Sequence, residues 1–170
     1  MNELLLENWQ LTLAVGIGAV MVVVALVALR DGPLPYERRG MLLSPPEIHF
    51  LRTLRSAVRE DWLVFSMVRL SDVLQVRPRT RQQQIWHSRI QAKHIDFVLC
   101  DQETLEVKLA IELDDASSRR PGRAKRDRFV STALAAAGLP LLKVPVVEKY
   151  ESAVIRKDIE DALGIRKRKR

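Results

Sequence analysis

The sequence has few of the residues that usually mark a cofactor site or a structural metal site. Its 170 residues include one cysteine, three histidines and 5% aromatic residues. The single cysteine, Cys100, excludes an internal disulfide, as is typical of a reducing compartment. Zinc-ligand spacings, phosphate-binding loops, dinucleotide fingerprints and serine-nucleophile elbows are all missing. The sequence therefore predicts no dinucleotide cofactor and no structural zinc.

Charge is absent from one long segment near the N-terminus. Residues 11–29 carry no charge, and Thr12 has the only polar side chain among them. An α-helix of about 19 residues is roughly 28 Å long, close to the hydrocarbon thickness of a bilayer. A core helix of a small soluble domain would have a polar face. Residues 1–30 are therefore predicted to form an N-terminal segment with one transmembrane helix; the alternative is a cleaved signal peptide.

Basic residues lie on one side of this apolar segment only. Glu3 and Glu7 precede it and Arg30 follows it, and the chain after residue 30, with 27 basic and 19 acidic residues, has a net charge of +8. The positive-inside rule predicts a single-pass protein of the bacterial inner (cytoplasmic) membrane, with its N-terminus outside and its C-terminal domain in the cytoplasm. Membrane lipid is thus an expected partner. The basic tail, residues 166–170, suits lipid headgroups or nucleic acid.

Turn residues and apolar periodicity divide the rest of the chain. Residues 31–43 are predicted to be a linker, 44–147 an α/β domain, and 148–170 a C-terminal helix with the basic tail. Helices are expected at 44–58, 82–92, 123–137 and 150–163, and strands at 62–68, 95–100, 107–113 and 141–144. Residues 71–76 fit a short strand or a loop. The short connection after residue 100 predicts an antiparallel hairpin, within a mixed sheet flanked by helices.

Three carboxylates stand at one end of this predicted hairpin. Asp96 opens its first strand, and Glu112 and Asp114 end its second strand. Residues two apart on a strand share a face, and antiparallel pairing brings Asp96 to the same end. Oxygen ligands of this kind suit Mg²⁺ or Mn²⁺, which can activate water for phosphodiester hydrolysis. The alternative is that these acids are solvated strand ends paired with arginines.

Several motifs in combination resemble one bacterial family. They are SPPEIHFLRTL (44–54), VRLSDVL (68–74), KHIDFVLCD (93–101), IELDD (111–115), RDxF (126–129) and AGLPLLKVP (137–145). Over roughly residues 42–147 the chain is similar to the family called domain of unknown function twenty-seven twenty-six. That family is similar in pattern to the PD-(D/E)XK and very-short-patch-repair-like nucleases. The resemblance implies a restriction-endonuclease-like fold and metal-dependent nuclease chemistry.

The resemblance also implies roles for individual residues. Asp96 and Glu112 would hold the metal, Asp114 would assist as a third catalytic acid, and Glu47 would be the acid of the early helix. Glu47 also lies three residues after Ser44, where a capping box needs an acid, and this position favours capping.

The chain departs from the nuclease pattern at two positions. Asp114 stands where the (D/E)XK motif has its lysine, and Ser118 stands where many relatives have a histidine. A missing base or phosphate-contacting group would impair turnover. His94 and Lys143 are the candidate substitutes.

A basic cluster follows the acids directly. Its members are Arg119, Arg120, Arg123, Lys125, Arg126 and Arg128. Arg123 and Arg126 are candidates for holding nucleic-acid phosphates; the alternative is a solvated helix face, with Arg126 paired to Glu112 or Asp127. The sequence thus predicts a membrane-anchored, Mg²⁺-dependent nucleic-acid hydrolase or binder. The alternatives are an inactive nuclease-fold scaffold and a structural membrane protein. Substrate type and oligomeric state stay open.

Overall fold

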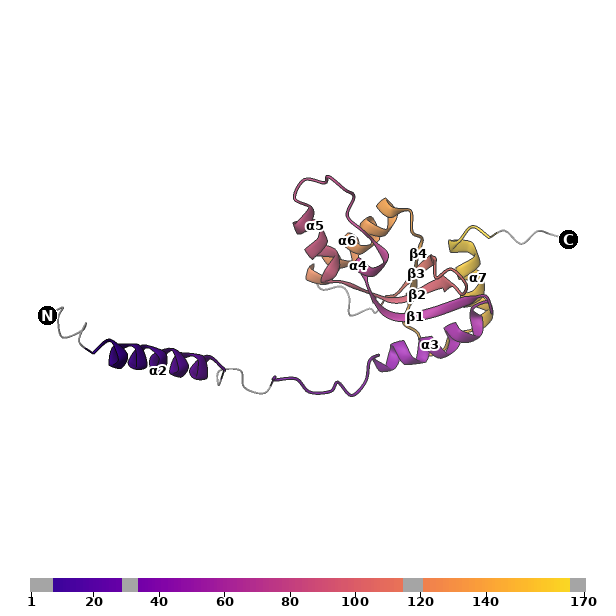
Figure 1. The fold of residues 1–170 in the computed structure, drawn as a ribbon. Helices are drawn as coiled ribbons and strands as arrows, with labels where there is room; N and C mark the ends of the chain where they lie inside the picture. The colour runs from indigo at the N-terminus through magenta and orange to yellow at the C-terminus, as the bar shows by residue number, and fades with distance from the viewer. Residues whose placement is uncertain (1–7, 29–33, 115–120, 166–170) are drawn as a thin grey trace. The chain divides into compact units, whose positions relative to one another are not determined.

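The computed structural model describes residues 8–28, 34–114 and 121–165, with only the backbone described for residues 121–126. Residues 1–40 and 41–170 form two compact units. Regular structure in the first unit is the helix α2, Trp9–Ala28 (Figure 1). It has 20 residues with a mean hydropathy of 2.7 and buries none of them in the protein. By length and composition, α2 can span a membrane, in agreement with the predicted helix at residues 11–29.

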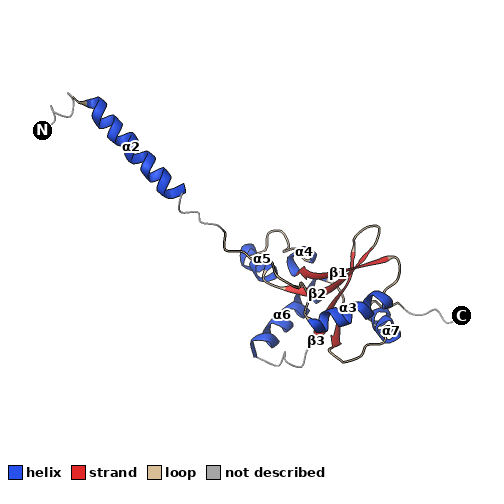
Figure 2. Ribbon diagram, turned by 90° about the horizontal axis from the view of Figure 1, so that it is seen from below, coloured by secondary structure: helices blue, strands red, loops and turns tan. Residues whose placement is uncertain are grey.

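The second unit contains a four-stranded mixed sheet with helices on both faces (Figure 2). In chain order its elements are α3 (Pro45–Ala57), β1 (Trp62–Arg69), α4 (Leu70–Val73), α5 (Gln83–Gln91), β2 (His94–Asp101), β3 (Val107–Asp114), α6 (Pro121–Ala137), β4 (Leu141–Pro145) and α7 (Ser152–Ala162). The strand order is β1-β2-β3-β4. The β1–β2 and β2–β3 pairs are antiparallel, and β3 pairs with β4 in parallel through the α6 crossover. The predicted mixed α/β class and the predicted hairpin are confirmed.

Two hydrophobic clusters hold the helices against the sheet. On one face, Phe50 of α3 and Ile155 of α7 pack against Phe97 and Ile111 of the sheet. On the other face lie α4, α5 and α6; there Val130 is buried in the same cluster as central sheet residues. The helix α7, which the sequence assigned to a separate C-terminal segment, is therefore part of the core of this unit.

One predicted element is wrong in part. Residues 71–76 were expected to form a short strand or a loop; Leu70–Val73 form the helical turn α4, whereas residues 74–76 are a loop, as one of the two alternatives predicted. Leu70 is fully buried and its N–H donates to the carbonyl of Lys93 at 2.8 Å. The Leu74 N–H then closes the turn on the carbonyl of Leu70 at 2.9 Å. Burial of one leucine against α5 and β2, which lie far along the chain, decides this conformation.

Candidate functional site

The candidate site lies where the β2–β3 ladder ends. The last pair of that ladder is Phe97 with Ile111, so Asp96 and Glu112 occupy the next opposed positions. Beyond that pair, a side-chain hydrogen bond takes the place of the next backbone hydrogen bond between the strands. Asp96 Oδ2 accepts a hydrogen bond from the Leu113 N–H at 2.7 Å. Asp96 is half-buried. Its carboxylate is thereby held against the backbone of β3, beside Glu112.

A local reversal of the side-chain pattern explains this position of Asp96. Residues two apart on a strand normally share a face. In β2, however, Ile95 packs in the cluster beneath α4, α5 and α6, whereas Phe97 packs in the cluster beneath α3 and α7. Opposite Asp96 in the β1–β2 register lies Met67, whose φ is +55°. A left-handed backbone is costly for a residue with a side chain. In both strands the side chains therefore switch here from one sheet face to the other, and Asp96 lies at the point where they switch.

The two acids of β3 face α6. Leu109, Ile111 and Leu113 pack in the cluster beneath α3 and α7, so the alternate residues Glu112 and Asp114 lie on the opposite face. Glu112 is half-buried and Asp114 is exposed.

Lys143, a candidate cation, neighbours these acids. It is the register partner of Glu112 in the parallel β3–β4 pair. Its neighbours Leu142 and Val144 pack in the cluster beneath α3 and α7, so Lys143 shares the α6 face with Glu112. Lys143 is exposed and lines a shallow depression beside α6. The tertiary structure thus brings a lysine next to the carboxylates, although the E-x-D segment itself has none.

The other predicted accessory residues lie elsewhere or outside the described side chains. Glu47 Oε2 accepts a hydrogen bond from the Ser44 N–H at 2.6 Å, which is the capping arrangement that its spacing favoured. Its helix α3 covers the sheet face opposite α6. His94 begins β2 as the register partner of Arg69. The described backbone of α6 contains Arg123 and Arg126, whose side chains are not described. Positions 115–120, including Ser118, Arg119 and Arg120, lie outside the described residues, as does the side chain of Lys125.

Asp96 and Glu112 have the chemistry of a divalent-cation site. Mg²⁺ is usually bound through one or two carboxylates and several waters, and two acids at opposed positions on neighbouring strands match that ligand set in type and number. Within the described part of the chain, no group of three or more histidine, cysteine or acidic residues is placed to hold a metal ion. The donor set that fits is therefore the pair Asp96 and Glu112, with Asp114 farther along the same strand.

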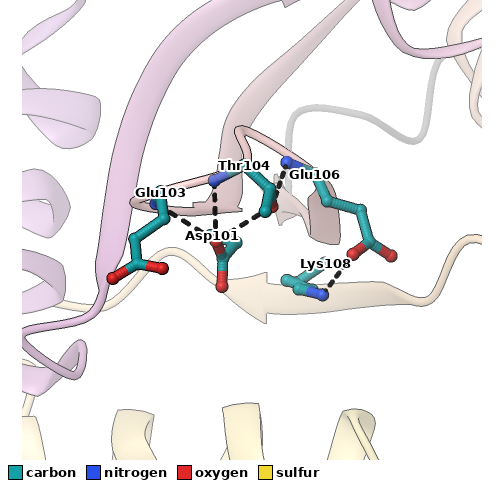
Figure 3. A network of polar contacts seen from close by, with 5 residues as sticks. All are labelled: Asp101, Glu103, Thr104, Glu106 and Lys108. Atoms are coloured by element: carbon teal, nitrogen blue, oxygen red, sulfur yellow. Dashed lines mark hydrogen bonds and ion pairs between the residues drawn. The ribbon is translucent and has the colours of Figure 1, made fainter.

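The opposite end of the hairpin is built around Asp101 (Figure 3). Asp101 Oδ1 accepts hydrogen bonds from the Glu103 N–H at 3.1 Å and from the N–H and hydroxyl of Thr104, both at 2.9 Å. The Thr104 backbone N–H is the main cause of a lowered Asp101 pKa, followed by the Thr104 hydroxyl. Lys108 and Glu106 form an ion pair at 2.6 Å, and the hydrogen bond to Glu106 raises the pKa of Lys108. This cluster shapes the turn.

Sequence reasoning missed an aromatic and cationic group on the α6 face. Trp86 and Arg89 lie in the helix that was expected at residues 82–92, and neither was given a functional role. In the structure, the Arg89 guanidinium lies over both Trp86 and Phe129. The three-residue spacing of Trp86 and Arg89 on a helix was the available signal. The contact with Phe129 of α6 had no local signal.

A protein-family model matches the part of the chain that contains these elements. The family described as Protein of unknown function (DUF2726) matches residues 39–163. The chain belongs to this family. The match confirms the resemblance drawn from the motifs, and it extends through α7. Neither the curated proteins nor the solved structures contain a match to the chain. DUF2726 membership thus covers every described element of the second unit, from α3 to α7.

Proposed function

We propose that this DUF2726 domain binds nucleic acid at the acidic end of the β2–β3 hairpin and hydrolyses its phosphodiester bonds with a divalent cation. The observation that carries the proposal is the position of Asp96, held by the Leu113 N–H at 2.7 Å directly beside Glu112. A restriction-endonuclease-like fold is part of the proposal. The four-stranded mixed sheet, with an aspartate on one central strand and Glu-Leu-Asp on the next, supports it.

The residues of the site would divide the chemistry among them. Asp96 and Glu112 would hold Mg²⁺ or Mn²⁺, because hard cations prefer carboxylate oxygens. When bound, such an ion activates water and neutralises charge on the leaving oxygen. Lys143, beside Glu112, is suited to contact a phosphate, and Arg123 and Arg126, which belong to α6, would add positive charge. The basic residues would thus retain the polyanion while the acids retain the ion.

A second candidate function is nucleic-acid binding without cleavage. Asp114 occupies the position at which the classical motif has a lysine, and an aspartate cannot supply that positive charge. The described acids also provide a pair of ligands rather than a larger cluster. An inactive nuclease fold would keep the basic surface and lose turnover. The experiment below separates the two functions.

Purified full-length protein in detergent should be tested on single- and double-stranded DNA and RNA with Mg²⁺, Mn²⁺ or EDTA. The Asp96→Asn and Glu112→Gln variants should lose at least about 100-fold in cleavage rate, because the bound ion contributes several kcal/mol of charge stabilisation. Binding in EDTA should persist in both variants, since removing negative charge near a polyanion relieves repulsion. Asp101→Asn is the matched control and should cleave normally.

Replacing Arg123 and Arg126 by alanine should weaken binding to every sequence and flatten its salt dependence, since each phosphate contact releases counterions. Salt-dependent binding without any cleavage by the unmodified protein would favour the inactive scaffold. Absence of binding even at low salt would contradict both functions and leave lipid or a protein as the partner of the basic surface.

We further propose that α2 anchors the domain in the inner membrane with the domain in the cytoplasm. Support comes from the apolar composition of α2 and from the basic residues that follow it, beginning with Arg30. A reporter fused after Arg170 should be active only if that reporter works in the cytoplasm. Activity of a periplasmic reporter at the same position would reverse the orientation.

A further inference from the structure

A groove lies between α5, α6 and residues 74–80, on the α6 face of the sheet. Its volume is about 950 Å³. The floor is apolar and includes Ile90, Phe129 and Ala133. The groove opens to solvent, because Trp86 is 41% exposed and Thr132 and Ala136 are exposed as well. An open apolar groove of this size on a charged protein is a candidate binding surface.

In this groove a cation lies between two aromatic rings, and a second cation, Lys93, lies beside the groove. The guanidinium carbon of Arg89 lies 4.9 Å from the ring centre of Trp86 and 5.5 Å from that of Phe129. The ammonium of Lys93 lies 4.7 Å from the same Phe129 ring. Attraction between cations and ring faces keeps the positive charges next to the apolar floor. The groove therefore offers flat apolar surfaces and positive charge side by side.

The charges of the groove select the kind of ligand. Arg77, Arg89 and Arg128 line it, and none of its described lining residues is acidic. A ligand that complements this surface carries repeated negative charges along a body with flat apolar faces. Single-stranded nucleic acid has this combination, since its bases stack on aromatic side chains while its phosphates contact arginines.

Phe129 links the groove to the segment that leads into the acidic end of the hairpin. Lys93, which contacts Phe129, directly precedes β2 and is three residues from Asp96. Three residues of strand cover roughly 10 Å, about the spacing of one or two nucleotides. The helix α6, which forms one wall, is also the helix toward which Glu112 faces. A strand in the groove would thus pass close to the carboxylates.

We propose that this groove binds single-stranded nucleic acid, with a base stacked on Trp86, with Phe129 in the apolar floor, and with phosphates held by Arg77, Arg89 and Arg128. The proposal rests on the proposed function and specifies its substrate class. An anionic lipid is the competing ligand, and its acyl chain would need an enclosed cavity. The exposure of Trp86 and the spread of three arginines along the groove favour the nucleic-acid strand.

The test is a binding comparison with full-length protein in detergent and EDTA. Three labelled probes of about 12 nucleotides, within the usual site size, are used: single-stranded oligothymidine, an abasic strand of equal charge, and a duplex. Oligothymidine should bind about tenfold more tightly than the abasic strand, because stacking discriminates by roughly that factor per base. The duplex should bind less tightly than oligothymidine, since its bases are not free to stack.

Two pairs of variants locate the binding. Trp86→Ala should remove most of the preference for oligothymidine over the abasic strand, whereas Ile85→Ala, on the same helix but outside the groove, should keep it. Arg128→Ala should weaken oligothymidine and abasic binding alike, and Arg52→Ala on α3 should weaken neither. Circular dichroism melting curves verify that Trp86→Ala is folded. If this variant does not fold, tryptophan fluorescence is measured instead. Oligothymidine should quench the fluorescence of the unmodified protein, and this quenching should be lost in Trp86→Phe.

Each other outcome overturns the groove proposal in a distinguishable way. Equal binding of oligothymidine and the abasic strand, with cleavage or binding otherwise intact, overturns the groove and leaves the proposed function standing. Loss of binding to phosphatidylglycerol vesicles, but not to oligothymidine, in Trp86→Ala assigns the groove to lipid instead. Absence of binding to all three probes at low salt overturns both proposals.

Discussion

The strand β2 carries an aspartate near each end, and the two are held in opposite ways. Asp101 accepts three hydrogen bonds, all from residues two or three positions ahead in the chain. Asp96 accepts its bond from Leu113, 17 residues away on the neighbouring strand. Asp101 therefore shapes a turn that the local sequence already encodes. Asp96 joins two strands where their ladder ends, and it stands beside another acid.

This difference indicates which of the two aspartates is suited to binding a cation. The turn directs the Thr104 hydroxyl and two N–H groups at one oxygen of Asp101, and its pKa falls accordingly. At the other end of the hairpin, the backbone N–H of Leu113 holds Asp96 opposite Glu112. A carboxylate that is held in place and adjacent to a second carboxylate is the arrangement a cation stabilises.

The largest expected effect concerns stability at the open end of the hairpin. Asp96→Ala leaves the part-buried Leu113 N–H without its acceptor and should lower the free energy of unfolding by about 1–3 kcal/mol. Asp96→Asn keeps an oxygen acceptor and should lose less than half of that. Thermal unfolding of the full chain followed by circular dichroism measures both. Equal losses in the two variants would show that charge, rather than the hydrogen bond, holds Asp96.

Next in size is the response to divalent cations. At a Mg²⁺ concentration ten times its dissociation constant, the unmodified protein should gain about 1.4 kcal/mol of stability, because the ion binds only the folded state. Asp96→Asn should lose this gain, and Asp101→Asn should retain it, since the turn engages the Asp101 carboxylate. Melting curves with and without Mg²⁺ test the contrast. A gain that disappears in Asp101→Asn instead would move the cation to the turn.

A smaller effect is expected at Lys143, the register partner of Glu112. Its charge should weaken cation binding at the neighbouring acids. Lys143→Met should tighten Mg²⁺ binding by about two- to fivefold, as expected for exposed charges that interact by roughly 0.2–1 kcal/mol. Titration calorimetry measures the change, with Lys149→Met as the control outside the sheet. Weaker Mg²⁺ binding in Lys143→Met would contradict this placement.

The smallest effect concerns pH at the turn. The Asp101 pKa is lowered from its ordinary value of 3.8 on folding, mainly by the Thr104 N–H, so its stabilising contribution is present above pH 3.8 and is lost as pH falls through the lower folded value. Asp101→Asn should therefore flatten the decline in stability as the pH falls below about 3.8. Acid-unfolding curves test this.

Asp61 provides the comparison for that measurement. The hydrogen bond from Arg59, 2.9 Å away, lowers the Asp61 pKa, so this carboxylate should supply part of the remaining acid dependence. An unchanged curve in Asp101→Asn would contradict the role assigned to the turn.

Elements with strong local signals were predictable from the sequence. Ser44 and Glu47 begin α3 at the expected position, and their capping contact depends on residues three apart. Gly138 follows α6 with a φ of +73°, as expected of a residue that ends a helix in the left-handed conformation. The apolar runs of β2 and β3 and their short connection were sufficient for the hairpin. The helical turn α4 was not predictable, because burial of Leu70 against distant elements decides its conformation.

The candidate site, too, was predictable from the sequence only in part. By itself, the sequence determined that Asp96, Glu112 and Asp114 lie near one end of a hairpin, because strand periodicity and turn length are local properties. Only the tertiary structure decided that β1 and β2 change sides at Met67 and Asp96, that Asp96 bonds to Leu113, and that Lys143 lies beside Glu112. It also brought Arg89 over Phe129. These contacts join residues separated by 17 or more positions, so strand pairing and helix packing fix them, and no local pattern encodes them.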